Sequence, residues 1–538
     1  MSITERKELL ERASNLPEQS EYFVSGISTL MSENANLKQK IDRLTELLLI
    51  AQRSRFGQSS ERRNYVLGGL DQVDILNSSA SEDNEPPRTA TDDSGPEACV
   101  EVKGHSRKIR RKMEEIIENL PCEIRNIDIP ENERFCKICG SELTYVGKKY
   151  IRTEIEVIPR QIKVVKYVIK TYNCKACVKE SDHANFHSAP VPPALFPHSL
   201  ASPSAVNDVM SQKYVYGLPL YRQEVMWKRS GFPLLRSTMA NWMIQASEIY
   251  FKPIYNRLKN ETVLLDVIHS DDTYIQVLKE PEKKASSQSH LWVYCSGRFC
   301  PRQIRLFEYS PDRKADNPVR FLGDFSGCLV TDGFSGFEKV SHAVLCRCWA
   351  HMRRCWRDAI PKGATGTLCK ASVGFEYCNK LFALERDFAD MTPEQRLAAR
   401  REKSRPILDE YWAWVDSLDP IGGSKLSEAV TYARHQRDSL NEFMNHGDVE
   451  ISNNIAENAI RPVVIGRKNW LFCDTVEGAK ASAIIYSLVE TAKANDLDPS
   501  KYLYYLLDGL RYHRDNMSDA VIESFLPWNP DVQAFCKA

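Results

Sequence analysis

The sequence predicts a multidomain α/β protein, and three observations support this fold class. The chain has 538 residues, more than one hydrophobic core usually organises, so several domains are expected. Two CxxC pairs between residues 136 and 177 indicate a small cysteine-rich domain. From residue 262 onward, short β-rich runs alternate with polar stretches of helical character, which is the pattern of an α/β sheet.

Composition narrows the class of protein. A hydrophobic content of 42% and a charged content of 27% are ordinary for a soluble globular protein. The formal net charge is zero, which does not decide about nucleic acid, because local patches matter more than totals. No apolar run reaches the roughly eighteen residues of a membrane span, and the charged N-terminus lacks a signal-peptide core. We therefore expect no membrane partner and a cytoplasmic location, where the 16 cysteines are mostly reduced or metal-bound.

Residues 1–65 are predicted to be helical. Apolar residues recur in steps of seven, four and three and form a short heptad seam, on which Asn34 also falls. The seam consists of Leu30, Leu37, Ile41, Leu44, Leu48 and Ala51. Two interpretations remain open: a zipper-like coiled coil that makes a homo-oligomer, or an amphipathic helix that packs on its own chain.

Residues 66–115 are predicted to be a flexible linker in two parts. Residues 68–101 contain nine acids and one base among Ser, Pro and Gly, a composition that favours a flexible acidic segment. Residues 103–112 contain six cations, which can either contact phosphate or remain solvated.

Residues 116–190 are predicted to be a zinc-finger domain. The four candidate ligands are Cys136, Cys139, Cys174 and Cys177. Two CxxC pairs suit tetrahedral coordination of Zn²⁺ by thiolates, and free thiols are the alternative. We expect a structural zinc, because four sulfur ligands leave no open position. The alternating sequence between the pairs predicts a β-hairpin that is broken at Pro159.

Residues 191–260 are predicted to be helical, with breaks at Gly217 and Gly231. Ser237 is the expected N-cap of a helix that runs through Trp242. If the helices form a helix-turn-helix, the residues offered to DNA are Arg236, Ser237 and Asn241. Helix pairs joined by glycine are also common without DNA, so this alternative stays open.

Residues 261–495 are predicted to be a ribonuclease H-like core. Three β-rich runs, a helical stretch, and then two more strands with a helix follow in the order of such a sheet. Asp271 and Asp272 lie within or just after the first run, and Asp332 closes the fourth, its neighbour in this topology. The remaining predicted segments are a helical insertion at about residues 360–445 and a C-terminal helical segment at residues 496–538.

Three acids far apart in the chain are candidates for one metal site. Asp271, Asp332 and Glu457 would meet beside the strand ends, and hard oxygen ligands suit Mg²⁺ or Mn²⁺. Two such ions about four ångströms apart can activate an attacking water or hydroxyl and stabilise the leaving oxygen of a phosphodiester. Each acid also has a structural alternative. The aspartates can cap turns, and Glu457 can form a capping box with Asn454 or an ion pair with Arg461.

Cations near these acids suggest a polyanionic partner. The candidates for DNA phosphates are Arg461, Arg467, Lys468 and Arg354. His351 precedes Arg354 in the run after the fifth strand, and it either orients a phosphate or carboxylate or satisfies the core. A second zinc site among the neighbouring cysteines is disfavoured, because strand residues two apart share a face for packing alone; these cysteines are Cys346, Cys348 and Cys355.

A series of motifs makes the chain recognisable. They are "SRFGQSSE", the two CxxC pairs, "KYVYGLPLYRQE", "STMANW", "HSDDT", "LWVY", "TDGFSGF", "CWAHMRR", "NNIAENAIRPVVIGRKNWLF" and "LPWN". With these motifs, the chain resembles transposases of the insertion sequence 66 family, which are bacterial DDE enzymes, nearly end to end. The combination is specific, whereas any one motif alone is weak.

The resemblance implies that the family's acidic triad falls on Asp271, Asp332 and Glu457. The family pattern Asp-Glu-Thr is matched by residues 271–273, so Asp272 departs from the usual Glu. Ser452 stands where an Asp commonly precedes the two asparagines. Both departures leave the triad intact but can change local geometry or weaken activity.

The resemblance also implies a function. A DNA transposase would bind the terminal inverted repeats of its element, hydrolyse a phosphodiester at each end, and join the freed 3′-hydroxyl to target DNA. Implied partners are these DNAs, further copies of the chain and small companion proteins of the same element, at the bacterial nucleoid. Two alternatives remain: a catalytically inactive DNA-binding protein derived from a transposase, and a ribonuclease H-like nuclease that cuts without joining.

Overall fold

The computed structural model describes nearly all of the chain after residue 186 and short stretches before it. The described residues are 26, 28–37, 40, 41, 43, 44, 47, 138, 141, 142, 160–173, 186–361 and 369–537. The chain divides into two compact units, Met1–Ser59 with Gln161–Ala538, and Ser60–Arg160. The four predicted zinc ligands lie outside the described residues.

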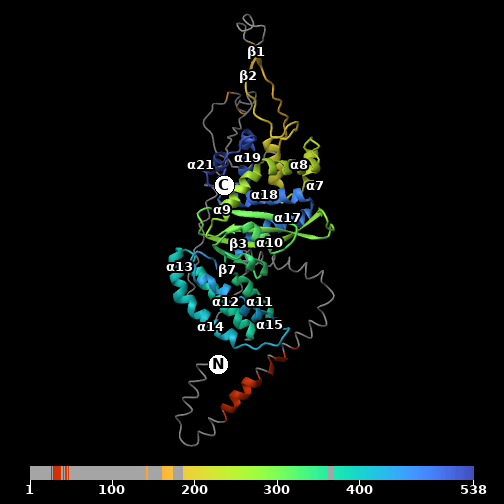
Figure 1. Cartoon of the computed structure of the whole chain (residues 1–538). Helices are drawn as coiled ribbons and strands as arrows, with labels where there is room; N and C mark the ends of the chain where they lie inside the picture. Colours follow the sequence, from red (N-terminus) through yellow and green to blue (C-terminus); the bar gives the residue numbers. More distant parts are fainter. Residues whose placement is uncertain are drawn as a thin grey trace. The chain divides into compact units, whose positions relative to one another are not determined.

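A mixed β-sheet forms the middle of the larger unit (Figure 1). Its main strands are β3 (Val267–Lys279), β4 (Gln288–Ser296), β5 (Arg305–Ser310), β6 (Cys328–Thr331) and β7 (Val344–Arg347). Their order is β5-β4-β3-β6-β7, with β3 to β5 antiparallel and with β6 and β7 parallel to β3. A short strand, β8 (Cys473–Thr475), pairs in parallel with the C-terminal end of β3. The five main strands coincide with the five β-rich runs of the sequence.

Helices make up most of the remaining described chain. Before the sheet and within it lie α6 (Pro203–Met210), α7 (Leu220–Arg229), α8 (Arg236–Ala246), α9 (Lys252–Thr262), α10 (Asp316–Leu322) and α11 (Trp349–Ala359). The predicted insertion contains α12 (Lys370–Asp387), α13 (Pro393–Ala399), α14 (Arg405–Asp416), α15 (Lys425–His435) and α16 (Arg437–Asn441). After it come α17 (Asn454–Trp470), α18 (Val476–Ala494), α19 (Pro499–Leu510), α20 (Asp519–Ser524) and α21 (Pro530–Cys536). Among the described residues, the helices are all too short or too polar to cross a membrane.

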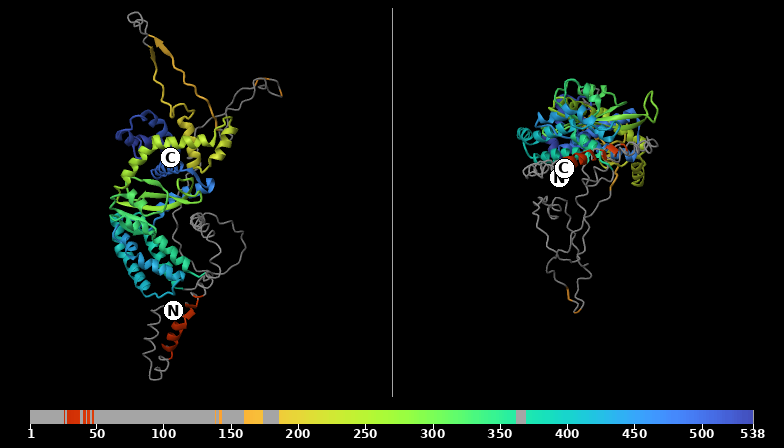
Figure 2. Two further views of the ribbon diagram at one scale, coloured as in Figure 1. Left: turned by 45° about the vertical axis from the view of Figure 1, so that its right-hand side comes forward. Right: turned by 90° about the horizontal axis from the view of Figure 1, so that it is seen from below.

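The strands of the sheet are buried on both faces. In β6, Cys328 and Val330 pack with α11 and the insertion helices, whereas Leu329 packs into the other, larger core, because successive side chains of a strand point to opposite faces. On the face that bears Asp271, α11 lies beside β6 and β7, and α17 lies against β3 and β4. The opposite face is covered by α9 and α10. In Figure 2, left, the insertion helices (cyan) and α17 to α19 (blue) flank the sheet (green).

Helix α18 closes the outer edge of the sheet. Strand β5 is an edge strand, and unpaired backbone groups there need other partners. The hydroxyls of Ser487 and Thr491 on α18 accept hydrogen bonds from the N–H groups of Phe307 (2.7 Å) and Arg305 (3.0 Å). Between Ala481 and Ala492, every residue of α18 except Ile484 is buried, which fits the apolar and small side chains on all sides of this stretch.

A buried ionic cluster connects the insertion to the segment before α17. Glu385 of α12 accepts hydrogen bonds from Arg400 (2.7 Å) and Arg396 (2.7 Å). The side chain of Arg400 is fully buried and also donates to the carbonyls of His446 and Val449. Burial alone would raise the pKa of Glu385, but the two guanidinium groups outweigh burial and lower it. The insertion therefore braces the chain that leads into α17.

Two local predictions, the N-cap at Ser237 and the heptad seam, can be compared with the described residues. Helix α8 begins at Arg236 with Leu235 as its N-cap, so the prediction that Ser237 is the cap is wrong. Its first turn follows directly from the extended backbone at Leu235 without a side-chain cap. The described seam residues of the N-terminal helix are exposed: Leu30, Leu37, Ile41 and Leu44. Their exposure leaves both interpretations of the seam open.

The described strands near the second CxxC pair correct the predicted hairpin. Strand β1 (Thr171–Asn173) pairs with β2 (Phe186–Ser188), so the two strands precede and follow the second pair in the sequence. Residues 160–170, which belong to the predicted hairpin, form no strand. A segment with an alternating sequence forms a strand only where a second strand pairs with its backbone N–H and C=O groups. Here the second strand is β2, which follows Cys177 in the sequence.

We predict that Glu385→Gln destabilises the protein by about 3 kcal/mol, because it leaves two buried guanidinium groups without their carboxylate. Thermal unfolding should show a clear loss in Tm. The control is Lys425→Gln, which removes an exposed ion pair with Glu428 and should change stability by less than about 0.5 kcal/mol. Equal effects of the two changes would contradict the bracing role.

Candidate catalytic site

The pairing of β3 with β6 brings two of the three candidate acids together. Val267 pairs with Cys328 and His269 with Val330, and the same register, continued two residues, sets Asp271 beside Asp332. Burial raises the pKa of Asp271 well above its usual value, and the negative charges of Asp332, Asp272 and Glu457 raise it further. All the candidate acids therefore lie within one electrostatic neighbourhood.

Asp332 follows β6 directly and is held in a turn. Its Oδ1 accepts a hydrogen bond from the N–H of Phe334 (3.0 Å), so the predicted turn-capping role is real. Arg347, fully buried on β7, donates to the carbonyl of Asp332 and to Thr331 Oγ1 (2.8 Å). The Oδ2 atom remains directed at Arg313, whose Nη2 lies 3.7 Å away.

Glu457 lies in the first turn of α17, where a negative charge interacts favourably with the helix dipole. The N-cap of α17 is Asn453, and no capping box forms with Asn454. The ion pairs of the described residues include none between Glu457 and Arg461. Instead, Glu457 Oε1 is a buried atom without a hydrogen-bond partner, 3.8 Å from Nε2 of His351.

A buried polar network fixes the start of α17 to β3. The side chain of Asn453 donates to the carbonyl of Ser270 (2.9 Å) and contacts Nδ1 of His269 (3.2 Å). Nε2 of His269 lies 2.8 Å from Glu450. Burial would raise the pKa of Glu450, but the hydrogen bond and charge of His269 outweigh it and lower the pKa. This network sets the position of Glu457, which is one helical turn after Asn453.

Asp272 lies on the opposite face of β3 and is fully engaged. It contacts His290 Nδ1 (2.7 Å) and accepts a hydrogen bond from Arg313 Nε (2.8 Å). The guanidinium of Arg313 also stacks on the ring of Phe334, 4.4 Å from its centre. Burial works against the charge of Arg313, but Asp272 and then Asp332 outweigh it and raise its pKa. Arg313 is therefore a cation shared between Asp272 and the candidate site.

A compact group of ligand atoms occurs where α11 meets α17. Cys348 Sγ, a ring nitrogen of His351 and a carboxylate oxygen of Glu457 all lie within 4.8 Å of one another. Asp271, Asp332 and Glu457 do not form such a group among the described residues. Burial lowers the pKa of His351, and the charge of Arg354 lowers it further, so its imidazole is neutral at pH 7.

Residues 198–481, which contain all three acids, match the family described as Transposase IS66 family. The chain belongs to this family. Residues 133–178 match the zinc-finger binding domain of transposase IS66, and residues 487–528 match the IS66 C-terminal element. The recognition from sequence motifs is thereby confirmed.

The transposase has relatives in Sinorhizobium fredii. It is 27% identical to uncharacterized protein y4hP over 498 residues, which are 88% of this chain and 86% of the relative. It is 28% identical to uncharacterized protein y4qI over 533 residues, which are 94% of this chain and 92% of the relative. Both similarities therefore extend over almost the whole chain.

The predicted DNA-binding cations differ in whether their side chains already have partners within the protein. Arg467 donates to Thr273 Oγ1 (3.1 Å) and stacks on Tyr274, 3.7 Å from the ring centre, so it fastens α17 to β3. Burial lowers its pKa. Lys468 is exposed and Arg461 is half-buried, and neither makes an ion pair with a described residue. These two side chains are available to an anion, whereas Arg467 already has neutral partners.

The other predicted contacts are more scattered. Arg236 and Asn241 are exposed on α8, where nothing in the structure brings them to the acids. Arg354 is half-buried on α11, close enough for its charge to act on His351. Its neighbour Arg353 instead donates to Asn379 (2.7 Å). Only Arg354 of these side chains therefore belongs to the surroundings of the carboxylates.

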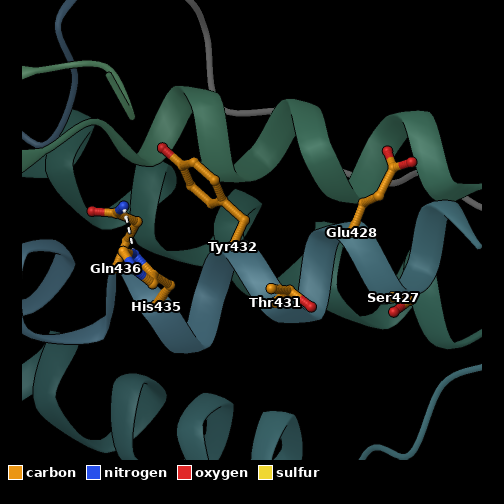
Figure 3. A pocket seen from close by; sticks show the side chains of 6 residues that line it. All are labelled: Ser427, Glu428, Thr431, Tyr432, His435 and Gln436. Carbon is orange, nitrogen blue, oxygen red and sulfur yellow. Dashed lines mark hydrogen bonds between the residues drawn. The ribbon is translucent and has the colours of Figure 1, made fainter. Parts of the chain in front are cut away.

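A groove of about 410 Å³ runs along α15 and is separate from the acids (Figure 3). Its lining residues are Ser427, Glu428, Thr431, Tyr432, His435 and Gln436. The groove approaches the site through Tyr432, whose ring packs against Gly333, the residue after Asp332, and through Gln436, which accepts a hydrogen bond from Arg347. A Cβ at position 333 would lie 2.6 Å from that ring, so a larger residue there would have to displace the ring.

Several residues of the site escaped the analysis of the sequence. The structure adds His269, Glu450 and Asn453 as the anchor of α17, and His290 with Arg313 as partners of Asp272. His269 and His290 begin the motifs "HSDDT" and "HLWVY", which was the one available signal. Arg313 stands in a loop without any pattern, so its role follows from tertiary structure alone.

We predict that Asp271→Asn stabilises the protein by about 1 kcal/mol at pH 7 without added divalent ions. The folded state holds the proton of Asp271 more tightly than the unfolded state, so wild-type stability falls as pH rises from the unfolded pKa through the folded pKa. The gain in Tm should therefore shrink as the pH is lowered toward 4.

Asp272→Asn is the matched control for this measurement. It weakens contacts with His290 and Arg313, so it should lower Tm under the same conditions. If Asp271→Asn lowered Tm as well, the cost of burying the Asp271 charge beside other acids would not be the dominant effect.

Proposed function

We propose that this member of the IS66 family is an active DDE transposase whose Asp271, Asp332 and Glu457 hold two Mg²⁺ or Mn²⁺ ions. The observation that carries the proposal is the register of β3 and β6, which sets two carboxylates on neighbouring parallel strands, with Glu457 on the helix packed beside them. The sheet order, three antiparallel strands followed by two parallel ones, supports a ribonuclease H-like core.

The chemistry of the donor set fits such ions. All three residues supply carboxylate oxygens, which Mg²⁺ and Mn²⁺ prefer. Burial, and then repulsion by the neighbouring acids, raises the pKa of Asp271, and a buried oxygen of Glu457 lacks a partner, so the site has uncompensated negative charge. The acids do not all meet at one point, which suits a pair of ions better than a single one. Bound ions would activate the attacking water or 3′-hydroxyl and stabilise the leaving oxygen.

The chain's own residues then have distinct roles. The charges of both Asp332 and Glu457 act on Asp271. Asp271 would therefore be a ligand of both ions, whereas Asp332 and Glu457 would each bind one of them. Arg313 balances the charge of Asp332 before metal is bound. Arg461 and Lys468 on α17 would contact backbone phosphates of the DNA. Arg354 on α11 would contact a phosphate at the other side of the site.

DNA recognition and assembly complete the proposal. The zinc finger, with Zn²⁺ on Cys136, Cys139, Cys174 and Cys177, would bind the terminal inverted repeats together with the exposed face of α8. Two ends must be held at once, so we propose a homo-oligomer through the N-terminal heptad seam. Small companion proteins of the element and the nucleoid as the site of action belong to the same proposal.

We predict that Asp332→Ala abolishes strand cleavage and joining with Mg²⁺, with a loss of at least about 10³-fold, but leaves binding to terminal-repeat DNA intact. Labelled element ends and a target plasmid report joined product, cut ends and bound complex separately. The control is Asp324→Ala, an exposed acid that precedes β6 and should keep all three. Joining by the Asp332 variant would refute the triad. Cut ends without joining by the wild type would favour a nuclease, and binding alone an inactive derivative.

We predict that Arg313→Gln raises the apparent affinity for Mg²⁺ about threefold, because the guanidinium no longer competes with Mg²⁺ for Asp332. The size of the effect is that of a partly exposed ion pair. Thermal unfolding at increasing Mg²⁺ concentrations gives this affinity from the rise in Tm, and the measurement does not depend on catalytic activity. The control, Lys314→Gln, removes the same charge from the adjacent exposed position and should leave the affinity unchanged. Weaker Mg²⁺ binding by Arg313→Gln would show that Arg313 does not compete at Asp332.

A further inference from the structure

The strongest unexplained feature of the described residues is the group formed by Cys348, His351 and Glu457. Their ligand atoms lie within 4.8 Å of one another and come from the starts of two helices. Cys348 is the residue before α11, His351 lies in its first turn, and Glu457 lies in the first turn of α17. The metal-binding chemistry of DDE acids does not require a thiol or an imidazole at this place.

Two atoms of this group lack partners. Glu457 Oε1 and His351 Nδ1 are both buried, and neither has a hydrogen-bond partner among the described residues. Buried polar atoms are nearly always satisfied, because leaving one without a partner costs about 1–3 kcal/mol. An unpartnered buried atom on each of two side chains, whose Nε2 and Oε1 atoms lie 3.8 Å apart, indicates a ligand that is not part of the protein.

The sulfur of Cys348 is surrounded by backbone donors. The N–H of Asn453 lies 3.1 Å from Sγ, and the N–H groups of His351 and Ala350 also act on it. Hydrogen bonds of this kind support a negatively charged sulfur, as they do around metal-bound thiolates. Without a metal, burial raises the pKa of Cys348 to about 12, so the free thiol keeps its proton.

The neighbouring cysteines do not belong to the group. Cys346 is buried on the face that packs with the insertion helices, where it contacts Cys328. Cys355 is one helical turn beyond His351 and supplies no atom to the group. The site therefore offers one thiol, one imidazole and one carboxylate, which differs from the disfavoured site among three cysteines.

We propose that Cys348, His351 and Glu457 bind a zinc ion that inhibits the transposase by withdrawing Glu457 from the catalytic ions. Mixed sulfur, nitrogen and oxygen ligands suit Zn²⁺, whereas Mg²⁺ takes oxygen only. Ligand atoms around a tetrahedral zinc are about 3.5 Å apart, so only a small closure is needed. Binding releases the thiol proton of Cys348 to solvent, with no change of oxidation state. The inhibition rests on the proposed function of Glu457, whereas the binding does not.

Co²⁺ serves as the spectroscopic probe for the binding step, added to full-length protein purified with its zinc finger loaded. We expect one further equivalent of Co²⁺ with a thiolate-to-metal absorption band and the visible bands of tetrahedral geometry. Cys348→Ser should remove the thiolate band, and His351→Ala should weaken binding by about 100-fold. Cys355→Ser is the matched control and should keep the spectrum. No further equivalent, or a band that survives Cys348→Ser in folded protein, would overturn the site.

Inhibition is tested by measuring DNA strand cleavage in Mg²⁺. The quantity compared is the ratio of the cleavage activity with added Zn²⁺ to that without it. We expect micromolar Zn²⁺ to suppress the wild type at least tenfold and to affect the His351→Ala variant much less. Binding of Co²⁺ without zinc inhibition would overturn the regulatory role of the site. Asp332→Ala separates this inference from the proposed function, because it should lose cleavage but keep the Co²⁺ spectrum.

Discussion

The arrangement of the site depends on the hydrogen bonds that Asn453 makes with β3. This fully buried side chain joins the carbonyl of Ser270 and the ring of His269, while its backbone N–H points at Cys348. Through these bonds the start of α17 is fastened to the central strand and to the start of α11 at once. A glutamate one helical turn later can then face the sheet in only one way.

The second constraint is electrostatic. The strands bring negative charges together that repel one another, and the surrounding protein only partly neutralises them. Arg313 supplies one cation, held by Asp272 on the other face of β3 and by the ring of Phe334. Asp272 therefore has structural partners of its own in His290 and Arg313. The same repulsion that lowers the stability of the protein favours the binding of cations, as expected for a site that binds a charged ligand.

The cations of α17 divide by their neighbours rather than by their type. Arg467 is used to fasten the helix against Tyr274, whereas Arg461 and Lys468 have no ion-pair partner among the described residues. The insertion contributes in a comparable way. Its buried Glu385 and Arg400 hold the chain just before α17, so helices far from the acids still set the position of Glu457. Both features stabilise the helix whose first turn contains Glu457.

The amino-acid sequence by itself determined the family, the five strands of the sheet, and Asp271, Asp332 and Glu457 as candidates. These follow from local patterns: alternation in strands, motifs of fixed spacing, and acids at strand ends. The zinc ligands and the oligomeric seam remain predictions of the sequence.

Only the tertiary structure decided which polar side chains are engaged. Arg467 and Lys468 look alike in sequence, and Ser237 resembles a helix cap, but burial and partners distinguish them. The anchor at Asn453, the ion pair of Arg313 with Asp272 and the approach of Glu457 to Cys348 and His351 each join residues more than 40 positions apart. No local pattern encodes such contacts, because they arise from strand register and helix packing.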